Sequence, residues 1–208
     1  MLRRALPCLL VLVTAGCALQ PPAGLPALDR DERRAVLLEI TRWEARGRIA
    51  VRMDGTGGQG GSQRGGQGNL RWTQDGDTVQ LRLSGPFGAG AYEITWDPVR
   101  LTIVSRDGST ALDYAGPDAA ERFLAEQLGW SFPVASSRYW LRGLADPASP
   151  ALETFDEAGR LAALEQHAWR VRYEDYVLHG RLWLPRKLVM ENPHGRVRLV
   201  VDAWEPGS

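Results

Sequence analysis

Residues 79–103 read VQLRLSGPFGAGAYEITWDPVRLTI, and this stretch decides the fold. Apolar and polar side chains alternate along it, and a Gly-rich turn and an Asp-Pro pair interrupt the alternation. A period of two residues is typical of a half-buried β-strand, in which successive side chains point to opposite faces of the sheet. Because no helical segment separates the runs, they predict short antiparallel strands and exclude βαβ units.

The same alternation continues on both sides of this stretch. Predicted strands cover residues 48–53, 70–72, 79–83, 92–96, 99–103, 161–165, 169–173, 187–191 and 196–202. We expect about eleven strands in all, and a sheet of that length must curl or close. The sequence therefore predicts a mainly β fold with helices (α+β), in which the sheet forms one side of a barrel or a curved surface.

Three helices are predicted around these strands. The first begins at Asp29 or Asp31 and runs to about Glu44. Its apolar side consists of Val36, Leu37, Ile40 and Trp43. The other two cover residues 117–129 and 133–143, where each begins at a proline and ends at a glycine. These two middle helices are the natural cover for the open side of the sheet.

Two segments are predicted to be flexible. Residues 17–28 are Pro-rich and without periodicity, as expected of a tether. Residues 55–68 hold eight glycines in fourteen positions and predict a flexible loop. Residues 29–208 are then expected to form a single domain, long enough to bury a substantial core.

The first residues have the features of an export signal. Arg3 and Arg4 form a basic start, and residues 5–13 form an apolar run that is too short for the ~20 residues a membrane span requires. Residues 1–16 are therefore predicted to be a signal peptide.

Small residues directly before Cys17 resemble the lipobox of bacterial lipoproteins, in which the cysteine is acylated and becomes the new N-terminus. Thr14 departs from that pattern, which usually has Leu there. The alternative is an ordinary signal peptide that happens to contain Cys8 and Cys17. No cysteine follows Cys17 in the sequence, so no disulfide is expected within the mature chain.

The balanced charge and the missing motifs exclude several classes of function. The chain has 25 basic and 25 acidic side chains, and without Arg3 and Arg4 it has 23 basic against 25 acidic. Such a balance argues against nucleic acid, whose binding depends on a basic surface. The Gly-rich segment lacks the Gly-Lys-Ser/Thr ending of a phosphate loop, and Ser62 does not fit a nucleophile elbow.

The three histidines, His167, His179 and His194, lie near turns or strand ends and are predicted to be surface residues. They are not spaced as metal ligands, and the sequence leaves no cysteine to join them. We therefore expect a binding protein and no enzyme, with no catalytic residue, no cofactor and no metal site.

Several stretches together resemble the LolB family of outer-membrane lipoprotein receptors, in the family's order and over nearly the whole mature chain. Besides Cys17, they are WEARGRIAVR (43–52), LRLSGPFGAG (81–90), GWSFPVASSRYWLRG (129–143), AWRVRYEDY (168–176) and LPRKLVMENPHGRVRLVVDAW (184–204). Two features depart from the family pattern. The Gly-rich insertion 55–68 is longer than expected, and Phe87 stands where the family usually has Leu.

The resemblance implies an open, strongly curved antiparallel β-barrel of about eleven strands, with about three helices as a lid over a hydrophobic cavity. It implies that acylated lipoproteins arrive from a periplasmic LolA-like carrier and are inserted into the outer membrane, with no nucleic acid involved. The protein is then expected to be a monomer that is lipid-anchored at the periplasmic face of the outer membrane of a Gram-negative bacterium. Ala18 agrees with this, because Asp at that position would imply inner-membrane retention.

Particular residues are expected to serve these roles. Phe87 lies between Pro86 and Gly88 on a hairpin tip and is predicted to dip into the bilayer; alternatively, its ring folds back to cap the sheet. The predicted cavity lining consists of Leu81, Leu83, Tyr92, Ile94, Trp96, Trp130 and Trp140.

Two other functions stay open from the residues alone. One is a structural or scaffold lipoprotein of the envelope, whose curved sheet docks a protein partner. The other is a lipid-modifying hydrolase, for which the sequence offers no triad.

Overall fold

The computed structural model describes residues 26–53, 64–85, 90–109, 111–128 and 131–207. Cys17, Phe87 and Trp130 lie outside the described residues. Within them, the chain forms one eleven-stranded antiparallel sheet with the order β6-β5-β4-β3-β2-β1-β11-β10-β9-β8-β7. The strands are β1 (Arg42–Met53), β2 (Arg64–Asp75), β3 (Thr78–Ser84), β4 (Tyr92–Asp97), β5 (Arg100–Ser105), β6 (Ala111–Ala115), β7 (Leu152–Phe155), β8 (Leu161–Gln166), β9 (Trp169–His179), β10 (Leu182–Asn192) and β11 (Gly195–Pro206).

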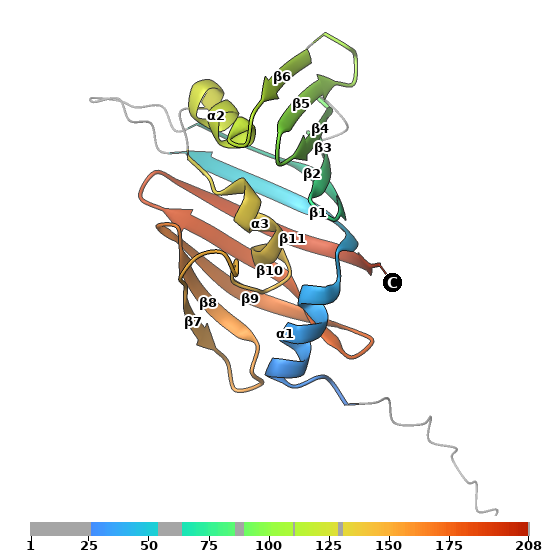
Figure 1. The fold of residues 1–208 in the computed structure, drawn as a ribbon, viewed down its shortest axis with the longest axis vertical. Coiled ribbons are helices and arrows are strands. Elements are labelled where there is room, and N and C mark those ends of the chain that lie inside the picture. Colours follow the sequence, from blue (N-terminus) through green and yellow to red (C-terminus); the bar gives the residue numbers. More distant parts are fainter. Residues whose placement is uncertain (1–25, 54–63, 86–89, 110, 129–130, 208) are drawn as a thin grey trace, which may run out of the picture.

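Helices cover one face of this sheet. They are α1 (Arg30–Glu39), α2 (Ala119–Phe123), the π-helical turn η2 (Leu124–Leu128) that continues α2, and α3 (Val134–Leu141). All three α-helices lie on the same side of the strands (Figure 1). None of the helices in the described part of the chain is long and apolar enough to cross a membrane.

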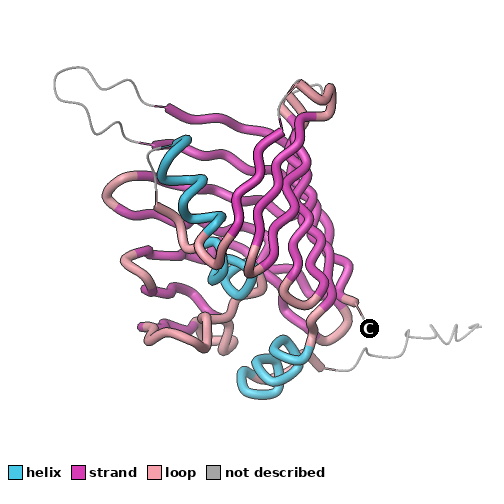
Figure 2. Tube along the Cα trace, turned by 45° about the horizontal axis from the view of Figure 1, so that its top comes forward, coloured by secondary structure: helices cyan, strands magenta, loops and turns pink. Residues whose placement is uncertain are grey.

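The sheet is curved and open. Figure 2 shows the strands bending around the side that holds the helices. The edge strands β6 and β7 do not pair with each other, so the sheet does not close into a complete barrel. The expected α+β fold with an open, curved antiparallel sheet of eleven strands and three α-helices is confirmed.

Tight turns join the strands where the sequence predicts them. Gly76 and Gly108 follow Asp75 and Asp107 and take positive φ angles of 58° and 73°. Glycine adopts this left-handed region without the steric penalty that other residues meet. These turns bring β3 back beside β2 and β6 back beside β5, within the meander from β1 to β6.

The first helix begins where expected but ends early. Asp29 caps α1 by accepting hydrogen bonds from the backbone N–H groups of Asp31 and Glu32, both at 2.9 Å. The helix ends at Glu39 and not near Glu44, because Ile40 is extended and β1 begins at Arg42. The helical spacing of the apolar residues is therefore misleading at Trp43, which lies on a strand.

The last residues of the Gly-rich segment form a strand, so the prediction of a flexible loop is wrong for them, and residues 55–63 lie outside the described residues. Residues 64–68 belong to β2 and pair with residues 49–53 of β1. Backbone hydrogen bonds form this pairing, so it needs no side-chain pattern. The two strands approach so closely here that a Cβ at Gly65 would lie 2.4 Å from the Val51 carbonyl oxygen. Only glycine fits this position without a shift of the backbone.

The core lies between the helices and the sheet. Trp43 stacks on Trp72 with ring centroids 5.7 Å apart, and Trp204 packs on Trp43 at 5.5 Å. Leu37 of α1 and Trp140 of α3 are fully buried against the same cluster. Buried aromatic side chains of this size contribute strongly to stability. This cluster therefore holds the start of β1 against the ends of β2 and β11.

Candidate functional site

The candidate site is the apolar face of the sheet that the helices cover, which we call the inner face. On β3 and β4, Leu81 lies opposite Ile94 and Leu83 lies opposite Tyr92. Val79 and Trp96 form the next pair along the same face. Five of the predicted lining residues therefore come from two neighbouring strands and share one face, because side chains alternate along a strand.

Burial along this face falls from one end of the strands to the other. Val79 and Trp96 are 3% and 6% exposed, whereas Leu81 and Ile94 are half-buried and Tyr92 is 41% exposed. We call the exposed end the mouth end and the buried end the floor. At the mouth end, the apolar side chains are only partly covered by the protein. They therefore form a surface onto which an apolar ligand can pack.

The central strand β1 shows the same gradient. Trp43 and Ala45 are buried at the floor, and Ile49, Val51 and Met53 are half-buried toward the mouth end. On β5, Leu101 and Ile103 stay buried, since α2 packs on β5 and β6. The inner face is therefore least covered over β1, β3 and β4.

Trp140 differs from the other predicted lining residues because it is completely buried. Its indole Nε1 donates to Gln166, and its backbone carbonyl accepts a hydrogen bond from the Tyr173 hydroxyl at 2.9 Å. Phe132 packs edge-on against its ring at 6.2 Å. These contacts attach α3 to the sheet, so Trp140 lies in the protein core between α3 and the inner face.

Two buried arginines attach α1 to neighbouring elements, and the sequence did not single them out. Arg142 Nη1 donates to the carbonyls of Leu37 and Ile40 at 2.5 and 2.7 Å. Arg33 Nε donates to the Trp183 carbonyl at 2.8 Å. Burial lowers the pKa of Arg142 to about 10 and lowers that of Arg33 as well. Both stay charged at neutral pH, and their carbonyl partners replace the water they have lost.

Neighbouring tyrosines belong to the same buried region. Burial raises the pKa of Tyr173 well above its usual value, and burial also raises the pKa of Tyr176. The Tyr176 hydroxyl donates to the Leu161 carbonyl at 2.6 Å. These hydroxyls therefore stay protonated and act as structural donors.

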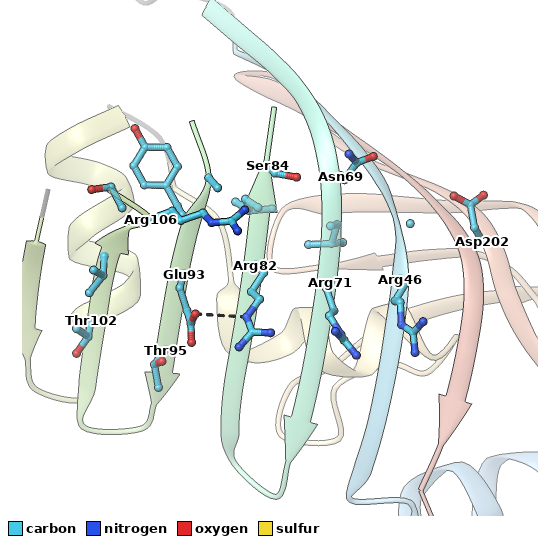
Figure 3. A pocket seen from close by; sticks show the side chains of 17 residues that line it. Arg46, Asn69, Arg71, Arg82, Ser84, Glu93, Thr95, Thr102, Arg106 and Asp202 are labelled. Atoms are coloured by element: carbon cyan, nitrogen blue, oxygen red, sulfur yellow. Dashed lines mark hydrogen bonds and ion pairs between the residues drawn. The ribbon is translucent and has the colours of Figure 1, made fainter. Parts of the chain in front are cut away.

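A hollow of about 1020 Å³ lies mainly on the opposite, polar face of the sheet, which we call the outer face. Figure 3 shows its arginines, carboxylates and hydroxyls on β1 to β5 and β11. Leu83 and Tyr92 border it where it reaches the mouth end. Charged and hydrogen-bonding side chains line this hollow together with apolar surface, so it is a second surface behind the inner face.

The predicted membrane-contact loop begins and ends at the mouth end. Gly85 follows β3, and Gly90, with φ 63°, precedes β4. Phe87 lies between them in the sequence, outside the described residues. The chain therefore enters and leaves this loop beside Leu83 and Tyr92.

The described residues offer little for metal chemistry. Among them, no three His, Cys, Asp or Glu side chains gather as a metal site would require. His167, His179 and His194 are exposed, as the sequence predicts.

The fold and the site together define an open antiparallel sheet whose apolar face is covered by helices and exposed at one end. Residues 41–204 match the family described as outer membrane lipoprotein LolB, and the chain belongs to this family.

Relatives named outer-membrane lipoprotein LolB are similar over most of their length. The protein of Nitrosococcus oceani is 35% identical over 201 residues, which is 95% of this chain and 94% of the relative. The protein of Chromohalobacter salexigens is 33% identical over 94% of this chain and 87% of its own. The crystal structure of a LolA superfamily protein from Nitrosomonas europaea matches at 9% identity and a TM-score of 0.48, covering 88% of this chain and 95% of that one.

Proposed function

We propose that this protein is an outer-membrane lipoprotein receptor whose inner face holds the acyl chains of incoming lipoproteins. The gradient of burial toward the mouth end is the observation that supports this proposal most directly. Leu81, Leu83 and Ile94 offer apolar surface there beside the fully packed floor. Membership of the LolB family supports the same conclusion.

Acyl chains need such a surface because water is a poor solvent for them. Each buried CH₂ group is worth ~0.8 kcal/mol, so exposing about three long chains costs tens of kcal/mol. A transfer protein must therefore cover the chains at every stage. The sequence has no nucleotide-binding motif, so transfer proceeds down a gradient of affinity from a LolA-like periplasmic carrier, through this protein, to the outer membrane.

The open sheet suits a ligand without fixed shape. Half-buried aliphatic side chains contact methylene groups without directional bonds, so chains of differing length and position fit similarly. Moderate affinity is also required, because the receptor must release what it accepts. We expect the protein to work as a monomer that a lipid on Cys17 anchors to the periplasmic face of the membrane.

Insertion is assigned to the loop between β3 and β4. Burying one phenylalanine side chain is worth ~1.5–3 kcal/mol, which is too little to anchor a protein but enough to hold the mouth end against a bilayer. In this proposal Phe87 makes that contact, and cargo leaves the inner face directly into the inner leaflet.

The test measures acyl-chain capture by the full chain purified in a mild detergent. A diacylated peptide is offered, and co-purified peptide is quantified by mass spectrometry. Leu83→Asp and Ile94→Asp are expected to lose most of the capture, because each places a carboxylate on the apolar surface. Leu152→Asp is the matched control, since Leu152 is 72% exposed on the edge strand β7.

The outcome separates this proposal from its alternative, a scaffold lipoprotein that docks a partner on the sheet. A wild-type chain that captures no diacylated peptide supports the scaffold. Equal capture by the two mouth-end variants and by the Leu152→Asp control, with all of them folded, rejects the inner face as the acyl site.

A further inference from the structure

The inner face continues without a break from its open part to the part that a helix covers. Ile94 of β4 lies directly opposite Ile103 of β5, and Ile103 lies directly opposite Leu112 of β6. Ile94 and Leu112 are half-buried, whereas Ile103 is only 4% exposed. Figure 1 shows α2 beside β5 and β6, where it packs on both strands. An acyl chain on β3 and β4 therefore meets this helix where the apolar surface continues.

α2 and η2, which we call the cover segment (residues 119–128), contact the rest of the protein mainly through apolar side chains. Phe123 packs edge-on against Tyr114 of β6, with ring centroids 5.7 Å apart. Phe123 and Leu124 are half-buried against the core, and Ala119 and Ala120 are buried. Such contacts have no directional requirement, so the methylene groups of an acyl chain can replace them.

The polar contacts of the cover segment are weak. In the described part of this segment, Arg122 is the residue whose side chain bonds to a strand, and it donates to the Ala115 carbonyl at the end of β6. Its Nε also donates to the Asp118 carboxylate at 3.1 Å, and both side chains are exposed. Exposed ion pairs contribute little to stability, so these contacts do not hold the segment against a competing ligand.

Buried hydrogen bonds hold the other two helices. The Tyr173 hydroxyl of β9 donates to the Trp140 carbonyl of α3, and Arg142 donates to the carbonyls of Leu37 and Ile40 at the end of α1. Moving either helix leaves buried polar groups without partners, which is costly. The methylene groups of an acyl chain cannot replace these partners. The cover segment is therefore the part of the helical layer that an acyl chain displaces at the lowest cost.

We propose that Phe123 and Leu124 occupy part of the acyl-binding surface in this structure and that an incoming acyl chain displaces them. The inference rests on the proposed acyl-binding function, and it names two residues that set the affinity of that site. Competition from these side chains weakens acyl binding, and their return to the sheet favours release of the cargo. The geometry of η2 agrees with this role, because short π-helical turns are rare and often lie at functional sites.

The test measures capture of the diacylated peptide by full-length variants over a range of peptide concentrations. Phe123→Ala and Leu124→Ala are each expected to bind the peptide about fivefold more tightly than wild type, because less protein surface competes with the ligand. Fivefold corresponds to ~1 kcal/mol, about half the burial energy of such a side chain. Ile94→Ala is expected to bind more weakly, since Ile94 belongs to the acyl surface itself. The opposite signs distinguish a competing side chain from a lining residue.

Tyr139→Ala is the matched control. Tyr139 is an aromatic residue of α3 that is half-buried against the same core, as Phe123 is. The guanidinium groups of Arg138 and Arg142 lie over its ring, at 5.0 and 5.6 Å from the centroid. Because α3 is not displaced, this variant is expected to capture the peptide with wild-type affinity. Urea unfolding midpoints confirm that each variant is folded.

Hydrogen exchange of the wild-type chain is a second measurement that needs no substitution. Capture of the peptide is expected to speed the exchange of backbone amides in residues 119–124, because a helix of five residues is unstable without packing. The amides of residues 134–141 in α3 are expected to exchange at the same rate with and without peptide.

Three results would overturn this inference while leaving the proposed function in place. The first is equal or weaker capture by Phe123→Ala and Leu124→Ala, which indicates that these side chains do not compete with the ligand. The second is an equal gain in Tyr139→Ala, which indicates a general loosening of the helices. The third is unchanged exchange in residues 119–124 on capture, which indicates that the cover segment stays in place. A wild-type chain that captures no peptide overturns the proposed function itself, and this inference with it.

Discussion

The indole Nε1 of Trp140 donates a hydrogen bond of 2.8 Å to the side-chain oxygen of Gln166, and both residues are buried. The same oxygen accepts from the backbone N–H of Asp146 at 3.0 Å. The amide nitrogen of Gln166 donates to the carbonyls of Asp146 and Ser149 at 2.8 and 2.9 Å. One side chain of β8 therefore satisfies four polar groups of α3 and the segment after it, and it attaches this helix firmly to the sheet.

Replacing this glutamine tests whether α3 is held as the hydrogen bonds indicate. Gln166→Leu leaves two buried donors and one buried carbonyl without their partner, besides the partly buried Ser149 carbonyl, at about 1–3 kcal/mol for each buried unsatisfied group. We expect a loss of about 3 kcal/mol or more in the free energy of unfolding, measured by urea titration. Gln80→Leu, at an exposed position of β3, is the control and is expected to stay within about 0.5 kcal/mol of wild type. Equal midpoints for the two variants would contradict this role.

Two strand glycines predict opposite responses to alanine. A Cβ at Gly47 would lie 2.0 Å from the Val200 carbonyl oxygen, whereas a Cβ at Gly66 has no neighbour within 4 Å. Gly47→Ala is expected to cost about 1–3 kcal/mol, as in other overpacked sites, because it pushes β1 away from β11. Gly66→Ala is expected to be neutral or slightly stabilising, since alanine restricts the unfolded chain. Thermal unfolding of both variants decides between these outcomes.

The turn between β5 and β6 predicts a pH dependence of stability. Hydrogen bonds from the Ser105 hydroxyl and from the backbone and hydroxyl of Ser109 lower the pKa of Asp107 from 3.8 to about 2. Between those values the folded state binds fewer protons than the unfolded state, so the stability from this carboxylate is present above pH 3.8 and lost as pH falls toward 2. Asp107→Asn is expected to be less stable than wild type at neutral pH, with a difference that shrinks in acid. Urea midpoints that differ equally at all pH values would refute this.

Phe87 separates receipt of cargo from its insertion. Phe87→Glu is expected to leave stability and transfer from carrier to receptor nearly unchanged and to block delivery to liposomes, because a carboxylate is disfavoured in the acyl region. Phe87→Leu is the matched control and is expected to deliver normally. Cargo is followed in the carrier, receptor and liposome fractions. Normal delivery by the Glu variant rejects membrane contact, and a joint loss of stability and receipt indicates that the ring packs on the sheet.

Cys17 tests the anchor. Cys17→Ala is expected to give a soluble periplasmic protein, because stable membrane residence requires more than one acyl chain or an equivalent second signal. Capture of acylated peptide should persist in this variant. The measurement is fractionation of cells into soluble and outer-membrane material. Recovery of the variant with the outer membrane would place the anchor elsewhere in the chain.

Side-chain alternation predicts the strands that have one buried face. Val79, Leu81 and Leu83 repeat every second residue, so the inner face of β3 follows directly from the sequence. The edge strand β6 alternates over only five residues, with Leu112 and Tyr114 on the inner face, and the edge strand β7 does not stand out at all. All four residues of β7 are exposed, so neither face of that strand has an apolar pattern. Residues 64–68 also lack an apolar pattern. They form a strand because their backbone pairs with β1 and lies close to it.

The candidate site is predictable in part for the same reason. The alternation places Leu81, Ile94 and Trp96 on one face, and the register confirms it. How far each side chain is buried depends on which part of the inner face the helices cover. No local sequence pattern predicts where the helices pack. The hollow on the outer face is hidden for a further reason. Its arginines Arg46, Arg71 and Arg82 are far apart in the sequence and become neighbours only through the register of three strands.

The pairing of β1 with β11 has a consequence for biogenesis. It joins the first strand of the chain to the last, with Trp43 opposite Pro206 and Met53 opposite Gly195 at the centre of the sheet. Contacts between such distant residues form slowly, because closing a long loop costs conformational entropy before the contacts can compensate for it. The sheet therefore stays incomplete until β11 has been synthesised. A chain that is made in one compartment and folds in another benefits from this delay, since it can pass through a narrow translocation channel before its two ends meet.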